Sequence, residues 1–159
     1  MKIFSFLFAL ASVSAVSSLC LNAICSSNPS NTIRGCDTQG CGHHGASRRG
    51  GTRKHNGIDV VCTPGSSVYA PFSGTIVRRT RPYATGGSYN NGLVLRGSGS
   101  WKGFEARIWY FTPKRTSGSM TAGENLGPYQ KLPYRGITQH VHLQLKKNGR
   151  SVNPASYVC

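Results

Sequence analysis

Histidines and acidic residues are scarce in this 159-residue sequence, which has five of the former and four of the latter. His140 and His142 are separated by one valine, and His55 precedes Asp59 by four residues. Side chains at positions i and i+2 of a strand project from the same face, so a strand here would present His140 and His142 to one site. Either motif alone fits a pair of surface side chains, but together they predict a metal centre.

Asp59 lies within an apolar, strand-like run, and an unpaired buried carboxylate would be costly. No Lys or Arg occurs between residues 55 and 77, so a cation close in sequence is missing. Two imidazoles and one carboxylate, with a fourth position left to water, form an open site that suits Zn²⁺ better than Ca²⁺ or Mg²⁺. We expect the remaining pair, His43 and His44, to be solvated in a Gly-rich loop or to make an incidental metal contact.

The elements that position these residues are expected to be strands. The sequence has 20 glycines, and short β-branched or aromatic runs lie between Gly, Asn, Pro and Ser clusters. This pattern predicts a mostly β, single-domain fold with an antiparallel core, irregular over residues 19–54. A hairpin turn is expected at Lys147–Arg150. The strand candidates are residues 57–62, 67–70, 74–77, 93–96, 106–111 and 140–146.

The N-terminal residues have the character of a secretory signal peptide. Lys2 is followed by a short apolar run and then by small residues, and the run is too short to span a membrane. We therefore expect a signal peptide over residues 1–18, cleaved after Ala15, Ser17 or Ser18, and a secreted domain over residues 19–159. A buried N-terminal strand is the alternative.

Six cysteines follow the expected cleavage sites. In a small exported domain they predict three disulfides, with 15 possible pairings. Cys36 and Cys41 bound a loop short enough to close on itself. Cys20 and Cys159 lie at opposite ends of the chain, and chain ends often meet at a domain surface.

The charge is strongly basic, with 19 Lys and Arg against four acids and a formal net charge of +15. Such a field attracts acidic cell-wall polymers, sulfated glycans and anionic membranes, although it also fits a role in solubility alone. The sequence contains no recognisable nucleic-acid-binding module, and export argues against a nucleic-acid partner.

The combination of HxxxD and HxH in a small β domain resembles the lysostaphin-type zinc metallopeptidases, endopeptidases that cut bacterial cell-wall peptides. The resemblance covers about residues 54–158 and implies a duplicated hybrid motif-like fold with bound Zn²⁺. Further segments that match the family are Ala70–Val77, Asn91–Val94, Ala122–Gly127 and Val152–Tyr157.

Within that family, the sequence is most similar to the leukocyte cell-derived chemotaxin 2 and myeloid protein-like subgroup, whose members are secreted signalling or immune proteins. The matching segments are Cys36–Gly42, His55–Cys62 and Val68–Phe72. The resemblance implies disulfides Cys25–Cys62 and Cys36–Cys41. We expect the two cysteines that it leaves, Cys20 and Cys159, to pair.

By the family pattern, His55, Asp59 and His142 would hold zinc, and His140 would be the catalytic general base that takes a proton from zinc-bound water. Active peptidases carry one more histidine, in a Y-x-H-L strand. Tyr110 keeps the Tyr of this motif, but Thr112 stands where the histidine belongs. Loss of such a transition-state donor costs on the order of 100- to 1000-fold in rate, and Thr112→His is expected to raise peptidase activity if the rest of the site is intact.

The residue pattern and the resemblance leave three candidate functions. The first is a secreted, zinc-binding, chemotaxin-like protein of innate immunity, catalytically weak or inactive, that binds microbial surfaces, anionic glycans or a receptor. The second is an active zinc metalloendopeptidase that cleaves peptidoglycan cross-bridge peptides. The third is a structural zinc domain, which the open ligand set disfavours because structural sites usually have four protein ligands.

Overall fold

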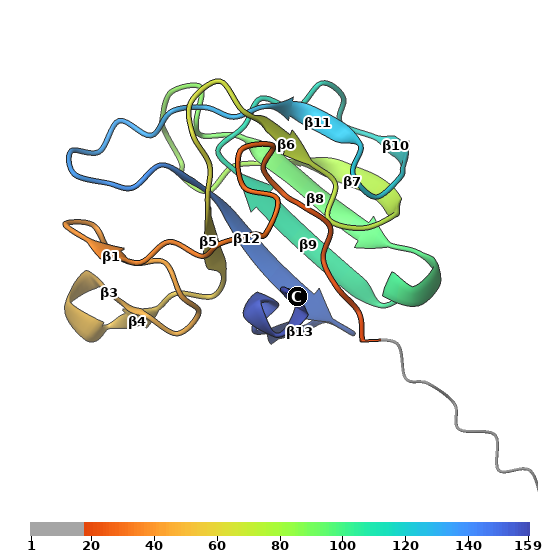
Figure 1. Cartoon of the computed structure of the whole chain (residues 1–159), viewed down its shortest axis with the longest axis horizontal. Helices are drawn as coiled ribbons and strands as arrows, with labels where there is room; N and C mark the ends of the chain where they lie inside the picture. The colour runs from red at the N-terminus through yellow and green to blue at the C-terminus, as the bar shows by residue number, and fades with distance from the viewer. Residues whose placement is uncertain (1–17) are drawn as a thin grey trace, which may run out of the picture.

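The computed structural model describes residues 18–159 (Figure 1). The predicted signal peptide lies outside the described residues except for Ser18. The prediction of a mostly β, antiparallel fold is confirmed, and within the described part the helical segments are three short 3-10 turns, Arg49–Gly51, Gly99–Trp101 and Pro154–Tyr157. Over the same residues, no helix has the length and apolar character needed to cross a bilayer.

Seven antiparallel strands form the main sheet, which carries the metal-centre residues. Six of them follow the order β10-β7-β8-β9-β12-β13, and β5 also pairs with β12. Their bounds are β5 Ile58–Val61, β7 Gly74–Thr80, β8 Gly92–Gly97, β9 Phe104–Trp109, β10 Gly118–Met120, β12 His140–Lys147 and β13 Arg150–Val152.

Strand β12 has three strand partners. One edge pairs with β9, and the other pairs first with β5, over residues 140–143, and then with β13, over residues 145–147. The β12–β13 turn is the hairpin predicted at Lys147–Arg150. The position of β12 between β5 and β9 brings the two halves of the HxxxD and HxH pattern together.

Three two-stranded sheets complete the fold. Strands β1 and β2 bound the Cys36–Cys41 loop, and β3 and β4 form a hairpin; both lie beside β5 in Figure 1. Strands β6 and β11 pair near β7 and β10. The bounds are β1 Cys36–Asp37, β2 Gly40–Cys41, β3 Ser47–Arg48, β4 Arg53–Lys54, β6 Ser67–Tyr69 and β11 Asn125–Pro128.

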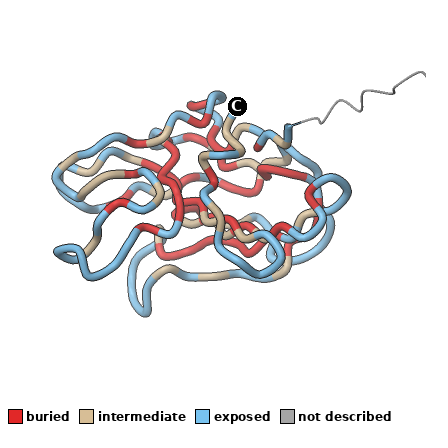
Figure 2. The backbone as a smooth tube through the Cα atoms, turned by 90° about the horizontal axis from the view of Figure 1, so that it is seen from below, coloured by how far each residue is buried: buried red, intermediate tan, exposed pale blue. Residues whose placement is uncertain are grey.

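Buried and more exposed side chains alternate along the strands, and the buried ones form the core. In β9, Phe104, Ala106 and Ile108 are buried, and the residues between them are partly exposed. Figure 2 shows the buried positions gathered along the strands inside the molecule, with exposed loops around them. Removal of apolar side chains from water is the main force that fixes this arrangement.

Strand β9 differs from the strand predicted over residues 106–111. It begins at Phe104 and ends at Trp109, because Tyr110 has a φ of 79°, outside the extended region. The chain turns there, and Phe111 forms an isolated bridge with Tyr129. This turn decides which side chains after β9 reach the metal centre.

The structure contains three disulfides: Cys20–Cys159, Cys25–Cys62 and Cys36–Cys41. These are the pairs expected from the sequence and the resemblance. The first ties the two ends of the described chain together, and the amide of Leu21 also donates to the carbonyl of Tyr157 at 2.7 Å.

Candidate metal centre

Strand register places Asp59 and His142 side by side. His142 on β12 lies directly opposite Asp59 on β5, so their side chains share one face of the sheet. Asp59 Oδ1 is 2.9 Å from His142 Nδ1, and His55, just before β5, brings its Nε2 within 3.0 Å of the same nitrogen. His55 Nε2 is 3.2 Å from Asp59 Oδ1. The three predicted ligands, two of them four residues apart and the third more than 80 residues further along the chain, thus converge on one point.

His140 borders the same point. Its Nε2 lies 3.6 Å from Asp59 Oδ1, as expected from the i, i+2 relation with His142. Its Nδ1 is 2.7 Å from the carbonyl oxygen of Thr138 and donates to it, which leaves the Nε2 lone pair facing Asp59. Burial lowers the pKa of His140, so the imidazole is neutral and able to accept a proton at neutral pH.

His55 is oriented by a residue that the sequence analysis placed in solvent. The Nδ1 of His55 donates to the backbone carbonyl of His43 at 2.9 Å, so its Nε2 faces the centre with a lone pair. The side chain of His43 is exposed, as expected, and it is the main chain of this loop that positions His55. A backbone contact of this kind leaves no signal in residue types.

The three converging atoms fit a zinc ion. In a tetrahedral site with bonds of about 2.0–2.1 Å, ligand atoms lie about 3.3 Å apart, close to the separations of 2.9–3.2 Å measured here. At most one proton can lie between these lone-pair atoms, whereas a cation would satisfy all three. The His142 Nε2 is buried without a hydrogen-bond partner among the described residues.

Asp59 is ionised in this setting. Burial opposes its charge, but a proton shared with the facing imidazoles of His142 and His55 outweighs burial and holds the pKa of Asp59 well below its usual range. A carboxylate in its charged form is the state that binds a metal.

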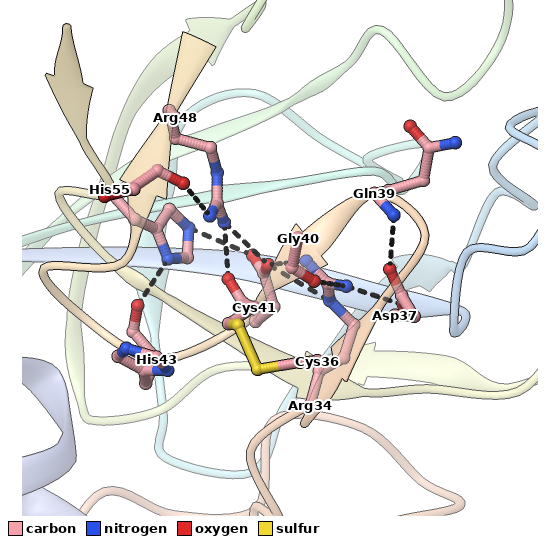
Figure 3. Close-up of a disulfide and its surroundings, with 11 residues drawn as sticks. Arg34, Cys36, Asp37, Gln39, Gly40, Cys41, His43, Arg48 and His55 are labelled. Carbon is pink, nitrogen blue, oxygen red and sulfur yellow. Dashed lines mark hydrogen bonds and ion pairs between the residues drawn. A yellow bond between two sulfur atoms is a disulfide. The ribbon is translucent and has the colours of Figure 1, made fainter. Parts of the chain in front are cut away.

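The cation partner of Asp59 is Arg34, which the sequence analysis missed. The guanidinium of Arg34 donates to Asp59 Oδ2 from both Nη2, at 2.9 Å, and Nε, at 3.3 Å, and its side chain is 2% exposed. Figure 3 shows Arg34 beside the Cys36–Cys41 disulfide and the loop that it closes. A second guanidinium, that of Arg48 on β3, lies 3.6 Å from the same oxygen. Arg34 precedes Asp59 by 25 residues, so no local pattern links them.

Two further residues shape the pocket around His142. Trp109 lies opposite His142 in the β9–β12 register and stacks on its ring at 5.0 Å between centroids. On the other side, Gly57 allows close approach, because a Cβ at this position would lie 2.8 Å from His142 Nε2 and 2.3 Å from the carbonyl oxygen of Leu143. The imidazole is therefore confined from both sides.

The centre opens into a cleft of about 310 Å³. Arg48 and Arg53 contribute cationic groups to its lining, and Leu132 and Ile137 contribute apolar ones. Three tyrosines from different segments also line it, Tyr83, Tyr110 and Tyr134. The cleft is thus amphipathic, with its positive groups next to the metal ligands.

Tyr110, not Thr112, occupies the position facing His140. The ring of Tyr110 meets that of His140 edge-on, with centroids 5.6 Å apart, and its hydroxyl is 2.9 Å from the hydroxyl of Tyr83. Thr112 is exposed and does not line the cleft. The expectation that Thr112 stands where the family histidine belongs stays a prediction about the sequence, and in this structure it is Tyr110 that contacts His140.

Comparisons with known proteins point to one family. Residues 53–154 match the model of Peptidase family M23. Leukocyte cell-derived chemotaxin-2 of Mus musculus is 44% identical over 138 residues, which are 85% of each chain. Myeloid protein 1 of Gallus gallus is 44% identical over 125 residues, 76% of this chain and 37% of that protein.

Among solved structures, the catalytic domain of the antimicrobial peptidase lysostaphin from Staphylococcus simulans has a similar fold. The TM-score is 0.56 at 19% sequence identity, and the match covers 81% of this chain and 94% of that one. At this identity the likeness supports the fold, while the chemistry must be judged from the residues themselves.

Proposed function

Because the chain belongs to Peptidase family M23, we propose that it is a secreted, zinc-binding, chemotaxin-like protein that has kept the peptidase fold for binding and has little or no peptidase activity. The observation that carries this proposal is the presence of Tyr110 where the cleft faces His140. Its partners would be anionic cell-wall or glycan polymers or a cell-surface receptor, in a role in innate immunity.

The metal half of the site supports zinc binding. His55, Asp59 and His142 converge as three ligands, and His55 and Asp59 each have a second partner that fixes their orientation. When bound, zinc would supply a Lewis acid and an activated water. His140 would hold or release a proton beside it.

The side of the cleft that carries Tyr110 supports the proposal that catalysis is weak or absent. A tyrosine hydroxyl can donate one hydrogen bond, but that of Tyr110 already interacts with Tyr83. Burial raises the pKa of Tyr110, so the group stays neutral and cannot supply the positive charge of an imidazolium. A missing donor to the developing oxyanion costs about 100- to 1000-fold in rate.

The surface charge supports an anionic partner. The four acidic residues each lie within 4.0 Å of an arginine, which leaves most of the basic groups uncompensated. The basic hairpin, which we define as Ser47–Lys54, carries Arg48, Arg49, Arg53 and Lys54, of which Arg48 and Arg53 line the cleft. A polymer drawn to this hairpin would lie along the cleft.

Secretion is supported by the cysteines. Every cysteine of the sequence lies in one of the three disulfides, which form and persist in oxidising compartments. The expected signal peptide and the chemotaxin-2 relatives point the same way. The three disulfides and these relatives together indicate an extracellular protein.

An active zinc metalloendopeptidase that cleaves peptidoglycan cross-bridge peptides is the second candidate. The complete set of three ligands and His140 favours it, because these residues suffice to hold zinc and to accept a proton from bound water.

The test that separates the two is release of soluble muropeptides from purified peptidoglycan. It uses mature, disulfide-intact protein with one zinc per chain confirmed, and His140→Ala as the control. We expect no release above that of the control. Release by the native protein that is lost in His140→Ala would show the endopeptidase instead.

Binding is tested with heparin and with teichoic-acid-bearing cell walls as probes. Arg49→Glu/Lys54→Glu alters the basic hairpin, and the matched variant Lys102→Glu/Lys114→Glu makes the same charge change at exposed positions elsewhere. We expect the hairpin variant to lose salt-sensitive binding and the matched variant to keep most of it. Equal losses would mean that net charge alone attracts these polymers, and no binding by native protein would favour a receptor.

A further inference from the structure

The Cys36–Cys41 loop contacts the metal centre from two directions. Its flanking residues are hydrogen-bonded to the main chain of Asp59, with Arg34 N donating to Asp59 O at 2.7 Å and Asp59 N donating to Gly42 O at 2.9 Å. Gly42 permits this approach, since a Cβ there would lie 3.1 Å from Asp59 Cβ and 2.6 Å from Arg34 O. The two ends of the loop thus hold Asp59 between them.

Arg34 continues this contact to the carboxylate. The two oxygens of Asp59 have different partners: Oδ1 faces the three histidines, and Oδ2 receives both bonds from Arg34. The Nη1 of Arg34 bonds to Asp37 Oδ2 at 2.6 Å and to the carbonyl of Gly40 at 2.7 Å, both within the loop (Figure 3). The guanidinium is therefore fixed at one end by the loop and fixes Asp59 with the other.

The same loop also contacts the segment before His140. Asp37 Oδ2 accepts a bond from the amide of Thr138 at 2.8 Å, and the side chains of Thr38 and Gln39 donate to the carbonyl of Arg135 at 3.2 and 3.0 Å. The carbonyl of Thr138 in turn accepts from His140 Nδ1. One chain of contacts therefore joins Asp59, Arg34, Asp37, Thr138 and His140.

We propose that Arg34 and the disulfide-closed loop form a positioning device for the metal centre, which directs Asp59 Oδ1 toward the metal and holds His140 beside it. Tight zinc binding then depends on Arg34 and on the Cys36–Cys41 disulfide, although neither provides a ligand. This inference rests on the zinc-binding part of the proposed function. It does not depend on whether the protein is a peptidase.

Geometry and electrostatics predict opposite effects of removing Arg34. If the guanidinium acts by orientation, its loss frees Asp59 to rotate, and outer contacts of this kind are worth about 10- to 100-fold in metal affinity. If it acts only as a positive charge close to a cation, its loss strengthens zinc binding. The direction of the change therefore decides between them.

The experiment measures the zinc dissociation constant of the folded, disulfide-intact protein by competition with a chromophoric chelator. Arg34→Gln removes the charge, and Arg34→Lys keeps the charge but loses the paired bonds. Arg115→Gln and Arg115→Lys are matched controls, since Arg115 pairs with Glu124 away from the metal centre. We expect about 10- to 100-fold weaker zinc binding in both Arg34 variants and no change in the controls.

Thermal unfolding with and without zinc separates positioning from plain stability. A merely structural role lowers the melting temperature equally in both states, whereas a positioning role also reduces the gain in melting temperature that zinc provides. Unchanged or tighter zinc binding in Arg34→Gln, with an undiminished gain, overturns the proposal. Failure of the native protein to bind zinc would instead reject the proposed zinc function.

Two milder variants decide the matter if Arg34→Gln does not fold. Asp37→Asn weakens the hold on Arg34, and Cys36→Ser/Cys41→Ser opens the loop while the other two disulfides remain. We expect each to weaken zinc binding by up to about 10-fold, which is the lower end of the effect expected for the Arg34 variants. Native-like affinity in both variants would show that the loop does not position the centre.

Discussion

The two sides of the cleft differ in how they are held. On the side of β5, β12 and the Cys36–Cys41 loop, two of the three candidate ligands have a fixed second partner, the His43 carbonyl for His55 and Arg34 for Asp59. On the side of the turn after β9, the group facing His140 is a tyrosine bonded to another tyrosine. One side carries three converging metal-ligand candidates, and the other carries a neutral tyrosine pair, the feature on which we base the proposal of little or no peptidase activity.

This contrast shows that metal binding and catalysis depend on different neighbours. Zinc affinity requires ligands that are oriented in advance, which the loop and strand register provide. Catalysis requires in addition a donor placed at the developing charge. A site without such a donor can still have its metal ligands in place, which is the arrangement that we propose for this protein.

The largest expected effect is the loss of zinc binding and of stability when a ligand on the metal side is removed. Asp59→Ala removes a ligand and leaves the Nε and Nη2 of Arg34 buried without a partner, while Asp37 still pairs with Nη1, which should cost about 1–3 kcal/mol of unfolding free energy. Zinc content should fall to near zero. Denaturant unfolding and metal analysis measure both. Glu124→Ala is the control, because its pair with Arg115 is more exposed and should contribute less than about 1 kcal/mol. Full zinc occupancy in Asp59→Ala would refute the ligand assignment.

The next largest expected effect is a gain of peptidase activity on the side of the cleft that carries Tyr110. Tyr110→His places an imidazole beside His140, at a positive φ that His tolerates better than most residues. We expect muropeptide release to rise by up to about 100-fold. Thr112→His serves as the matched control and should change nothing, since Thr112 is exposed outside the cleft. A gain confined to Thr112→His would show that the turn places these residues differently.

A smaller effect concerns the confinement of His142. Gly57→Ala forces a Cβ against the Leu143 carbonyl and His142, and overpacking of this kind costs about 1–3 kcal/mol. We expect weaker zinc binding together with a lower melting temperature. At Gly35, by contrast, an added Cβ meets nothing within 4 Å, so Gly35→Ala should behave like the native protein. Equal behaviour of the two variants would mean that His142 is not confined as described.

The smallest effect is a pH dependence of stability. Although burial opposes the charge of Asp37, hydrogen bonds from Thr138 and Arg34 lower its pKa to about 2 from the ordinary 3.8. The stabilisation is therefore complete above about pH 4 and is lost as the pH falls toward 2. Asp37→Asn should lose less unfolding free energy over this interval, as measured by denaturant titrations at fixed pH. An unchanged slope would contradict the lowered pKa.

The candidate ligands of the metal side could be predicted because the patterns that mark them are local in the sequence. Alternation along a strand places His140 and His142 on one face, and the HxxxD spacing marks the second half of the site. The mostly β fold and the hairpin at Lys147–Arg150 follow from residue types in the same way. The partner of Asp59 could not be predicted, because Arg34 lies on a loop that only folding brings to β5.

The sequence by itself determined the residue types of the metal centre, the basic charge, and six cysteines with a short loop between two of them. Only the tertiary structure decided which groups face the metal ligands. Tyr110 reaches His140, and Thr112 does not, because one backbone turn redirects the chain. Arg34 and the His43 carbonyl meet Asp59 and His55 through long-range packing, which no spacing encodes.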